Sequence, residues 1–349
     1  MPHERSEAAM RKGKISESVL KRSVLKYINS RRDEVVKGAG IGTDCAFLKW
    51  NGAETKESFA QWPALSAQTV TLPVKEAGKL AVYAAVNNLA AAGAKPVAVT
   101  ASVTLPFEAE EALLKDIMKQ IGRSADELKL QIAGGHTEVT DSVKAPIITI
   151  TALGKYSSEL WEKAEAEKRM QDKTKLDIVM TKWIGMEGTV ILAKEKEEEL
   201  LTRYPISLIR SAQGFEKYLP IIPEAATALK SGVYAMHDMR NGGVFGALFE
   251  LARSMGVGLS VDLKQIPVKQ ETIEICEFYD LNPYELLSGG SLLILTEDGK
   301  LLVKELREKE IFSAVIGKTT AGNDKIVLND EEIRFLEPAK TDEIFKINF

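Results

Sequence analysis

Three glycine-rich segments of the sequence carry residues that can bind phosphate or transfer protons. They run from Gly38 to Asp44, from Ala133 to Thr140 with His136 inside, and from His237 to Gly243. Glycine lets a backbone turn tightly and bring its amides close to an anion, and a nearby carboxylate can hold Mg²⁺ beside a phosphate. Each segment alone is weak evidence. Because each has an acidic residue close by, the three together favour phosphate and metal handling.

The third segment precedes a run with strong helical apolar periodicity. Asn241, Gly242 and Gly243 are therefore expected at a helix N-terminus, where unpaired amides and the helix dipole attract phosphate. A plain helix cap is the alternative there, as a solvent-facing His136 in a strand-turn-strand is for the second segment. The first segment is not a Walker A loop, because no Gly-Lys-Ser/Thr follows it.

Composition excludes several classes of protein. The chain has 46 Lys and Arg against 50 Asp and Glu, a net charge of −4, so nucleic acid is not the expected partner. With 45% hydrophobic and 28% charged residues it is an ordinary globular chain. Cys45 and Cys276 have no paired spacing, and the first residues lack an apolar signal region, so we expect a cytoplasmic protein. Polar residues interrupt the apolar stretch 80–105, which excludes a membrane span.

The element pattern predicts two units of α+β or α/β type. The first, 1–156, is expected to hold helices at 15–37, 76–92 and 108–121 and strands at 68–72, 97–105 and 147–153. A charged connecting segment, 157–175, separates it from the second unit, 176–349. That unit is expected to hold helices at 187–201, 223–231, 244–255 and 270–279 and strands at 176–181, 257–263 and 291–296.

An ordered set of motifs extends over nearly all of the chain. It comprises Gly-x-Gly-Ile-Gly-x-Asp at 38–44, Gly-Ala-Lys-Pro at 93–96, Gly-Gly-His-Thr-Glu-Val-Thr at 134–140, Glu-Gly-Thr at 187–189 and His-Asp-x-x-x-Gly-Gly at 237–243. This order resembles the aminoimidazole ribonucleotide (AIR) synthase superfamily, also called PurM-like. The residues of the third motif, together with Ile-Pro-Val at 266–268 and Ile-Cys-Glu at 275–277, most resemble the HypE branch of this superfamily, the hydrogenase maturation factors.

The resemblance implies a PurM-like homodimer that binds ATP and Mg²⁺, in which the mixed sheets of the N-terminal domains pair and the C-terminal domain is α/β. By position, His237, Asp238 and His136 would be catalytic, and Asp44, Asn88 and Glu138 would face the metal. The implied nucleotide-binding positions are Gly40, Gly42, Asp44, Lys79, Asn87, Asn88, Gly134, Gly135, Thr137, Asn241, Gly242 and Gly243. Besides ATP and a small substrate, a protein partner of the hydrogenase-maturation type is implied.

Three departures from the family pattern bear on activity. Gln68 and Asn88 stand where the family has Mg²⁺ carboxylates, and an amide brings no charge to a hard cation. The sequence reads Asp342-Glu343-Ile344 near its end but shows no terminal Pro-Arg-Ile-Cys, whose thiol accepts a carbamoyl group in HypE proteins.

Two functions of different classes follow. The first is a Mg²⁺-dependent enzyme that uses ATP to activate a small substrate by phosphorylation. The second is a catalytically degenerate nucleotide-binding protein that acts through a partner, and thiamine-monophosphate kinase or AIR synthase is a further alternative.

Overall fold

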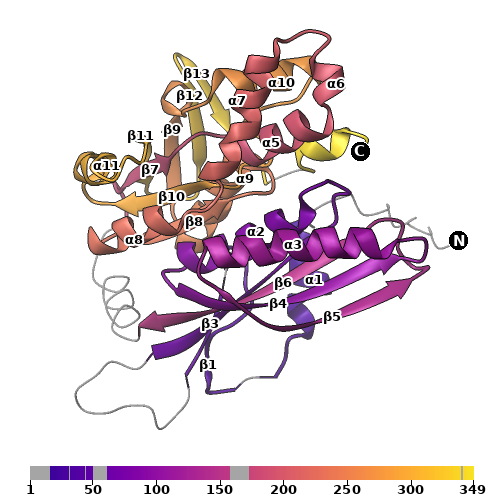
Figure 1. Ribbon diagram of the computed structural model, residues 1–349. Helices are drawn as coiled ribbons and strands as arrows, with labels where there is room; N and C mark the ends of the chain where they lie inside the picture. The colour runs from indigo at the N-terminus through magenta and orange to yellow at the C-terminus, as the bar shows by residue number, and fades with distance from the viewer. Residues whose placement is uncertain (1–15, 31, 44, 50–60, 158–172, 339–340) are drawn as a thin grey trace, which may run out of the picture.

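The computed structural model describes residues 16–30, 32–43, 45–49, 61–157, 173–338 and 341–349. Two α/β units, each built on a mixed sheet, follow one another along the chain (Figure 1). This architecture confirms the fold class predicted from the sequence.

The first unit is a six-stranded sheet in which only β4 and β5 pair in parallel. Its strand order is β1 (Val35–Lys37), β2 (Ala46–Leu48), β3 (Gln61–Val70), β6 (Ile147–Ser157), β4 (Lys95–Pro106) and β5 (Gln131–Thr140). The helical elements are α1 (Glu17–Ser23), the short η1 (Leu25–Tyr27), α2 (Ala77–Ala91) and α3 (Glu111–Glu127). Figure 1 shows α2 and α3 between this sheet and the second unit.

The second unit is a seven-stranded sheet in which β9 and β12 pair in parallel. Its order is β13 (Glu332–Phe335), β12 (Lys325–Asn329), β9 (Gly258–Asp262), β11 (Ser313–Thr320), β7 (Asp177–Thr181), β10 (Ser291–Thr296) and β8 (Ala235–Met239). Its helices are α5 (Met186–Glu195), α6 (Glu197–Leu200), α7 (Ile206–Gln213), α8 (Ile222–Lys230), α9 (Gly243–Met255), α10 (Gln270–Phe278) and α11 (Gly299–Arg307). Short 3₁₀ turns lie at η2 (Gly214–Tyr218), η3 (Leu263–Gln265) and η4 (Glu343–Lys346).

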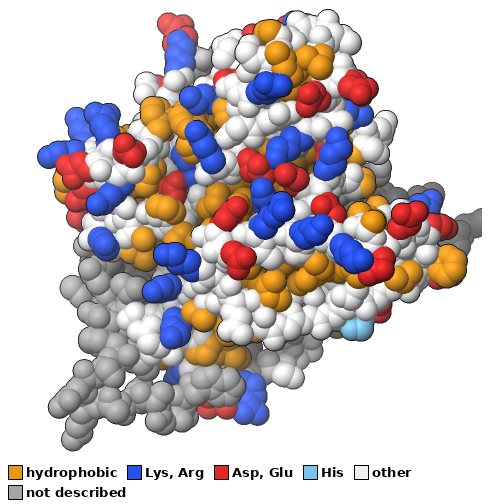
Figure 2. Space-filling view, in the orientation of Figure 1, with side chains coloured by type: hydrophobic (Ala, Val, Ile, Leu, Met, Phe, Trp, Pro, Cys, Tyr) orange, Lys and Arg blue, Asp and Glu red, His pale blue; other side chains and the backbone are white. Residues whose placement is uncertain are grey.

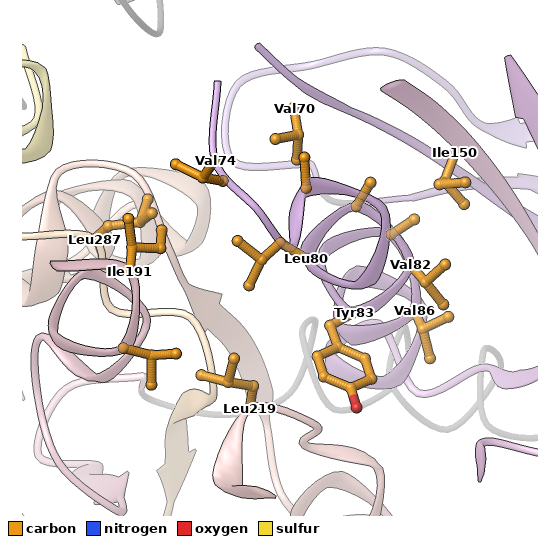
Figure 3. Close-up of a cluster of buried hydrophobic side chains, with 14 of the residues drawn as sticks. Val70, Val74, Leu80, Val82, Tyr83, Val86, Ile150, Ile191, Leu219 and Leu287 are labelled. Carbon is orange, nitrogen blue, oxygen red and sulfur yellow. The ribbon is translucent and has the colours of Figure 1, made fainter. Parts of the chain in front are cut away.

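Helix α2 joins the two units because it is apolar on all sides. Every residue of it except Lys79 is buried, and it contacts β3 and β6 of the first unit as well as β8 and α8 of the second. A helix that is hydrophobic all round has to be enclosed by protein. Figure 3 shows its side chains Leu80 and Tyr83 in one cluster with Ile191, Leu219 and Leu287 of the second unit.

Charged side chains of both signs lie across the seam between the units (Figure 2). Lys79 Nζ lies 2.5 Å from Glu216 Oε1, and Lys194 Nζ lies 2.8 Å from Glu216 Oε2 and 2.5 Å from Glu76 Oε2. Burial acts to raise the pKa of Glu216, but a hydrogen bond with Glu76 together with the two lysines holds it at about 2. The seam is therefore closed by ion pairs outside and apolar packing inside.

The prediction of one helix over 15–37 is wrong. The chain forms only α1 and η1 there and then turns into β1. Val24, Tyr27 and Ile28 stay exposed and Val19 and Leu20 are only half-buried, so the apolar stripe is poorly packed. Short helices depend on such packing for their stability.

The tight turn predicted at Gly134 and Gly135 is also wrong, because both residues lie inside the extended strand β5. The strand pairs with β4 in parallel, and a Cβ on Gly135 would lie 1.9 Å from the Ala101 carbonyl oxygen. The glycine thus permits close strand approach. None of the helices in the described part of the chain is long and apolar enough to cross a membrane.

Candidate functional site

Two adjoining cavities open where the units meet, and together they form the cleft of this molecule. Their volumes are about 300 Å³ and about 370 Å³. Both are lined by Gln68 and Asn88 of the first unit and by Asn241 and Glu250 of the second. The cleft therefore brings together residues from two of the sequence motifs, those at 38–44 and 237–243.

The first unit supplies an amide pair to the cleft. Gln68 comes from β3 and Asn88 from the last turns of α2. The Asn88 amide is oriented with its nitrogen toward the second unit, because only this orientation pairs both of its ends. The nitrogen then donates to Asp238 Oδ1 and Oδ2 at 2.8 and 2.9 Å, and the oxygen accepts from Gln68 Nε2 at 2.6 Å.

The second unit supplies a histidine and two carboxylates. His237 and Asp238 lie on β8, the edge strand of its sheet, and are 5% and 8% exposed. His237 Nε2 lies 3.2 Å from Glu250 Oε2 on α9. A histidine held by a carboxylate can accept or deliver a proton in the cleft.

The N-terminus of α9 begins in two glycines with left-handed backbone. Gly242 has φ +80° and Gly243 has φ +61°, and a Cβ on Gly243 would lie 2.3 Å from the Tyr284 carbonyl oxygen. The Gly242 N–H donates to Asp342 Oδ2 at 2.6 Å. This amide, predicted to bind phosphate, is engaged by a carboxylate of the chain.

Asp342 is a site residue that the sequence motifs did not single out. Its Oδ1 accepts from the N–H groups of Leu287 and Ile344 at 3.1 and 3.0 Å. Burial raises its pKa to about 7, and the Glu187 carboxylate adds to this against the three backbone donors. Its position one residue before the turn η4 is typical of an N-cap, which is the only sequence signal for it.

A buried ion pair lies beside this end of the cleft. Arg240 Nε and Nη2 contact the Glu187 carboxylate at 2.9 to 3.2 Å, and both side chains are largely buried. The Glu187 carboxylate raises the pKa of Arg240 against the effect of its burial. The sequence motifs contained Glu187 but gave no reason to pair it with Arg240.

The glycine-rich segment at 40–43 lines the cleft beside Gln68 and Asn88. Gly42 has φ +64°, and a Cβ there would lie 2.9 Å from Ser254 Cβ on α9. The segment therefore needs a glycine at this position for both conformation and space. Asp44, predicted as a phosphate and metal ligand, lies outside the described residues.

The second motif lies away from the cleft. Gly134, Gly135, His136, Thr137 and Glu138 are all exposed on the edge strand β5. His136 Nε2 and Glu138 Oε2 lie 3.1 Å apart, with both side chains more than half exposed. Within one chain, these residues do not meet His237 or Asp238.

Two further predicted nucleotide-binding residues have contacts at the seam. Lys79 pairs with Glu216 as described above. Asn87 Nδ2 donates to the Leu219 carbonyl oxygen at 2.8 Å, and its Oδ1 accepts from the Ile221 N–H at 3.1 Å. Asn87 thus ties α2 to the second unit, while the adjacent Asn88 faces the cleft.

A divalent cation would find few charged ligands in this arrangement. The described residues contain no group of three or more His, Cys, Asp or Glu side chains placed to hold a metal. Asp238 is flanked by the amides of Asn88 and Gln68 rather than by carboxylates. The donors fit a cation that brings its own phosphate oxygens better than a free Mg²⁺.

Comparison with known proteins identifies both units. The family models described as AIR synthase related protein, N-terminal domain and C-terminal domain, match residues 41–156 and 177–329. A putative hydrogenase expression/formation protein of Methanocaldococcus jannaschii is 26% identical over 271 residues, which cover 75% of this chain and 76% of the relative. A carbamoyl dehydratase HypE of Rhodobacter capsulatus is 26% identical over 258 residues, 72% of each chain.

Solved structures share the fold at lower identity. A chain of the HypE–HypF complex aligns with a TM-score of 0.70 at 20% identity, covering 92% of this chain and 99% of its own. A HypE structure in complex with ATP aligns with a TM-score of 0.65 at 17% identity, covering 96% and 98%.

Proposed function

This chain belongs to the AIR synthase-related family, and we propose that it binds ATP in the cleft between its units and phosphorylates an oxygen of a small substrate. The observation that supports this best is the convergence of Gln68 and Asn88 with His237 and Asp238 on one cleft. The relative named above as a carbamoyl dehydratase suggests a carbamoyl oxygen as the acceptor.

The cleft residues have distinct roles in this proposal. The backbone of Gly40 and Gly42 lies beside the phosphates, where its amides can donate to their oxygens. As the carbamoyl oxygen attacks the γ-phosphorus and ADP leaves, His237, held by Glu250, takes the proton that the carbamoyl nitrogen loses. Asp238 and Asn88 orient the substrate by hydrogen bonds. Mg²⁺, held by phosphate oxygens together with Asp238 and Asp44, would neutralise charge on the transferring group.

Calorimetric titration of ATP with Mg²⁺ and then with EDTA, followed by an ADP-release assay, tests the proposal. We expect binding that requires Mg²⁺ and slow ADP release that a carbamoylated substrate accelerates. His237→Gln and Asp44→Asn should each lower turnover by at least about 100-fold with the fold intact, as expected for a lost general base or metal charge. Full turnover in either variant would contradict that residue's assignment.

A degenerate nucleotide-binding protein is the second candidate. It is favoured by the hydrogen bonds of the Asn88 amide to both oxygens of Asp238, which leave that carboxylate less free for a metal. In this case ATP binds without ADP release, and Gln68→Asp combined with Asn88→Asp strengthens Mg²⁺-dependent binding. A protein partner then carries the function, and the HypE–HypF complex is an example of a protein of this fold bound to a partner.

We also propose a homodimer that pairs the N-terminal sheets through β5. The strand is exposed on both faces and has an unpaired edge, and Ile132 and Val139 on it are 36% and 54% exposed. Such an edge favours pairing with another chain. Pairing would cover the motif of His136, Thr137 and Glu138. Light scattering should give twice the chain mass, and Val139→Lys should give one chain mass.

We propose in addition that the chain has two domains, 1–156 and 176–349, joined by a connecting segment, 157–175. We also propose a cytoplasmic location. Separate expression of the two domains tests the division, because each should give a cooperative unfolding transition.

A further inference from the structure

An ion pair at the outer end of the cleft fixes α1 over the glycine-rich segment. Glu17 Oε1 lies 3.1 Å from Arg253 Nη2 on α9 and 2.5 Å from Lys21 Nζ. No residue of α1 is buried. The Glu17 ion pair therefore ties this helix to α9.

A second cation lies behind Arg253. Lys325, at the start of β12, is only 8% exposed, and its Nζ lies 5.0 Å from the centre of the Phe249 ring. Its ammonium donates to the neutral carbonyl oxygen of Asn323 at 2.8 Å. Burial and the Arg253 guanidinium lower the pKa of Lys325, whereas the carboxylates of Asp324 and Glu17 act to raise it. Glu17, Glu250 and Arg253 line the cavity wall here, and Lys325 lies behind Arg253.

This wall belongs to the same cavity as the amide pair. Glu17 and Arg253 line it together with Phe249, and Gln68 and Asn88 line its inner part. A ligand in the cleft can therefore reach Arg253 while it contacts the first unit.

We propose that Arg253, with the positive charge of Lys325 behind it, forms an anion-binding subsite for an acidic group of the substrate, a phosphate or a carboxylate, and that Glu17 competes for it. A carboxylate on a guanidinium makes the contact that a substrate oxyanion would make. Because a partly exposed pair is worth at most about 1 kcal/mol, it can be exchanged for a ligand. Phe249 beside the guanidinium gives the rest of the substrate an apolar surface.

This inference deepens the proposed function, on which it rests only for the statement that the anion belongs to a substrate. It divides the cleft into a proton-transfer end at His237 and a charged end at Arg253. The substrate it describes has a reacting oxygen at one end and a negative charge at the other.

Calorimetric titration with inorganic phosphate and, separately, with succinate tests the subsite and distinguishes the two anion chemistries. Glu17→Gln should tighten binding of the preferred anion about fivefold, the factor that corresponds to an ion pair of about 1 kcal/mol. The double variant Glu17→Gln with Arg253→Gln should lack this gain in anion affinity. Lys325→Gln alone should weaken anion binding. High salt should reduce every difference.

Asp330→Asn is the matched control, because Asp330 forms an exposed ion pair with Lys264 away from the cleft. It should leave anion binding unchanged. Equal affinity of the unmodified chain, Glu17→Gln and Arg253→Gln for both anions would overturn the subsite, and so would an equal gain in Asp330→Asn.

ATP titrations of the same variants separate this inference from the proposed function. Tighter phosphate or succinate binding in Glu17→Gln without any ATP binding would support the subsite and contradict the ATP proposal. Mg²⁺-dependent ATP binding with no effect of any variant on the binding of either anion would support the ATP proposal and contradict the subsite.

Discussion

Replacement of Asn88 by aspartate tests whether the cleft has exchanged a metal site for an amide network. The Asn88 nitrogen donates to both oxygens of Asp238 at 2.8 and 2.9 Å, and both side chains are buried. Aspartate at position 88 would place a second carboxylate oxygen where that nitrogen lies. Two hydrogen bonds to a charged acceptor would become a repulsive contact.

The destabilisation has an upper limit set by protonation. At an effective dielectric constant of about 20, two charges about 3 Å apart repel by roughly 5 kcal/mol. Protonating one carboxyl group costs about 1.4 kcal/mol per pH unit above a pKa of about 3.9, or about 4 kcal/mol at pH 7. Protonation costs less than the repulsion between two charges, so one carboxyl group becomes protonated. We therefore expect Asn88→Asp to lower the free energy of unfolding by about 4 kcal/mol at pH 7 and by about 2 kcal/mol near pH 5.5.

Urea unfolding with and without millimolar Mg²⁺ measures both effects. Mg²⁺ between the two carboxylates should restore most of the lost stability, because a divalent cation removes the repulsion. Asn87→Asp is the control: it is buried on the same helix, but its contacts are the Leu219 carbonyl oxygen and the Ile221 N–H. It should be destabilised without recovery in Mg²⁺. A stable Asn88→Asp at pH 7 without Mg²⁺, or equal recovery of both variants, would refute the reasoning.

Three other substitutions have defined outcomes. Glu187→Gln should cost about 3 to 5 kcal/mol in urea unfolding, because it leaves the buried Arg240 charge without its partner. The Asp342 carboxyl group has a pKa of about 7 in the folded chain and 3.8 in the unfolded chain. Its contribution to the free energy of unfolding therefore falls as the pH rises between these values. Asp342→Asn should remove this fall from a plot of the urea midpoint against pH. Gly243→Ala should lower the melting temperature far more than Gly256→Ala, since both residues have positive φ but only Gly243 would meet a backbone carbonyl.

The periodic elements were predictable because their pattern and their packing agree. The expected helix at 76–92 and strands at 97–105 and 147–153 correspond to α2, β4 and β6, most of whose apolar residues are buried. The prediction of a helix at 15–37 failed because much of its apolar stripe stays exposed. Strand β5 was missed because an exposed edge strand with two adjacent glycines lacks the apolar alternation by which strands are recognised.

The cleft was predictable only in part, because its partners come from distant parts of the chain. Motif spacing put Asn241, Gly242 and Gly243 at a helix N-terminus, and α9 begins at Gly243. His237 and Asp238 lie on the preceding strand β8. It could not show that Glu250 would face His237, or that Asp342 would reach the Gly242 amide across 100 residues of sequence. Such contacts depend on the packing of the second sheet against α9 and η4, which no local pattern encodes.

The adjacent residues Asn87 and Asn88 show how α2 couples the fold to the cleft. In a helix, neighbouring side chains point about 100° apart, so one residue can bind the second unit while the next faces the cavity. Asn87 holds the backbone at 219–221, and Asn88 holds Asp238 of the same unit. The apolar contacts of Leu80 and Tyr83 keep this helix in place between the sheets. A change in the relative position of the two units would therefore alter both contacts at once, and a ligand that replaces Asn88 at Asp238 would loosen one of the polar links between α2 and the second unit.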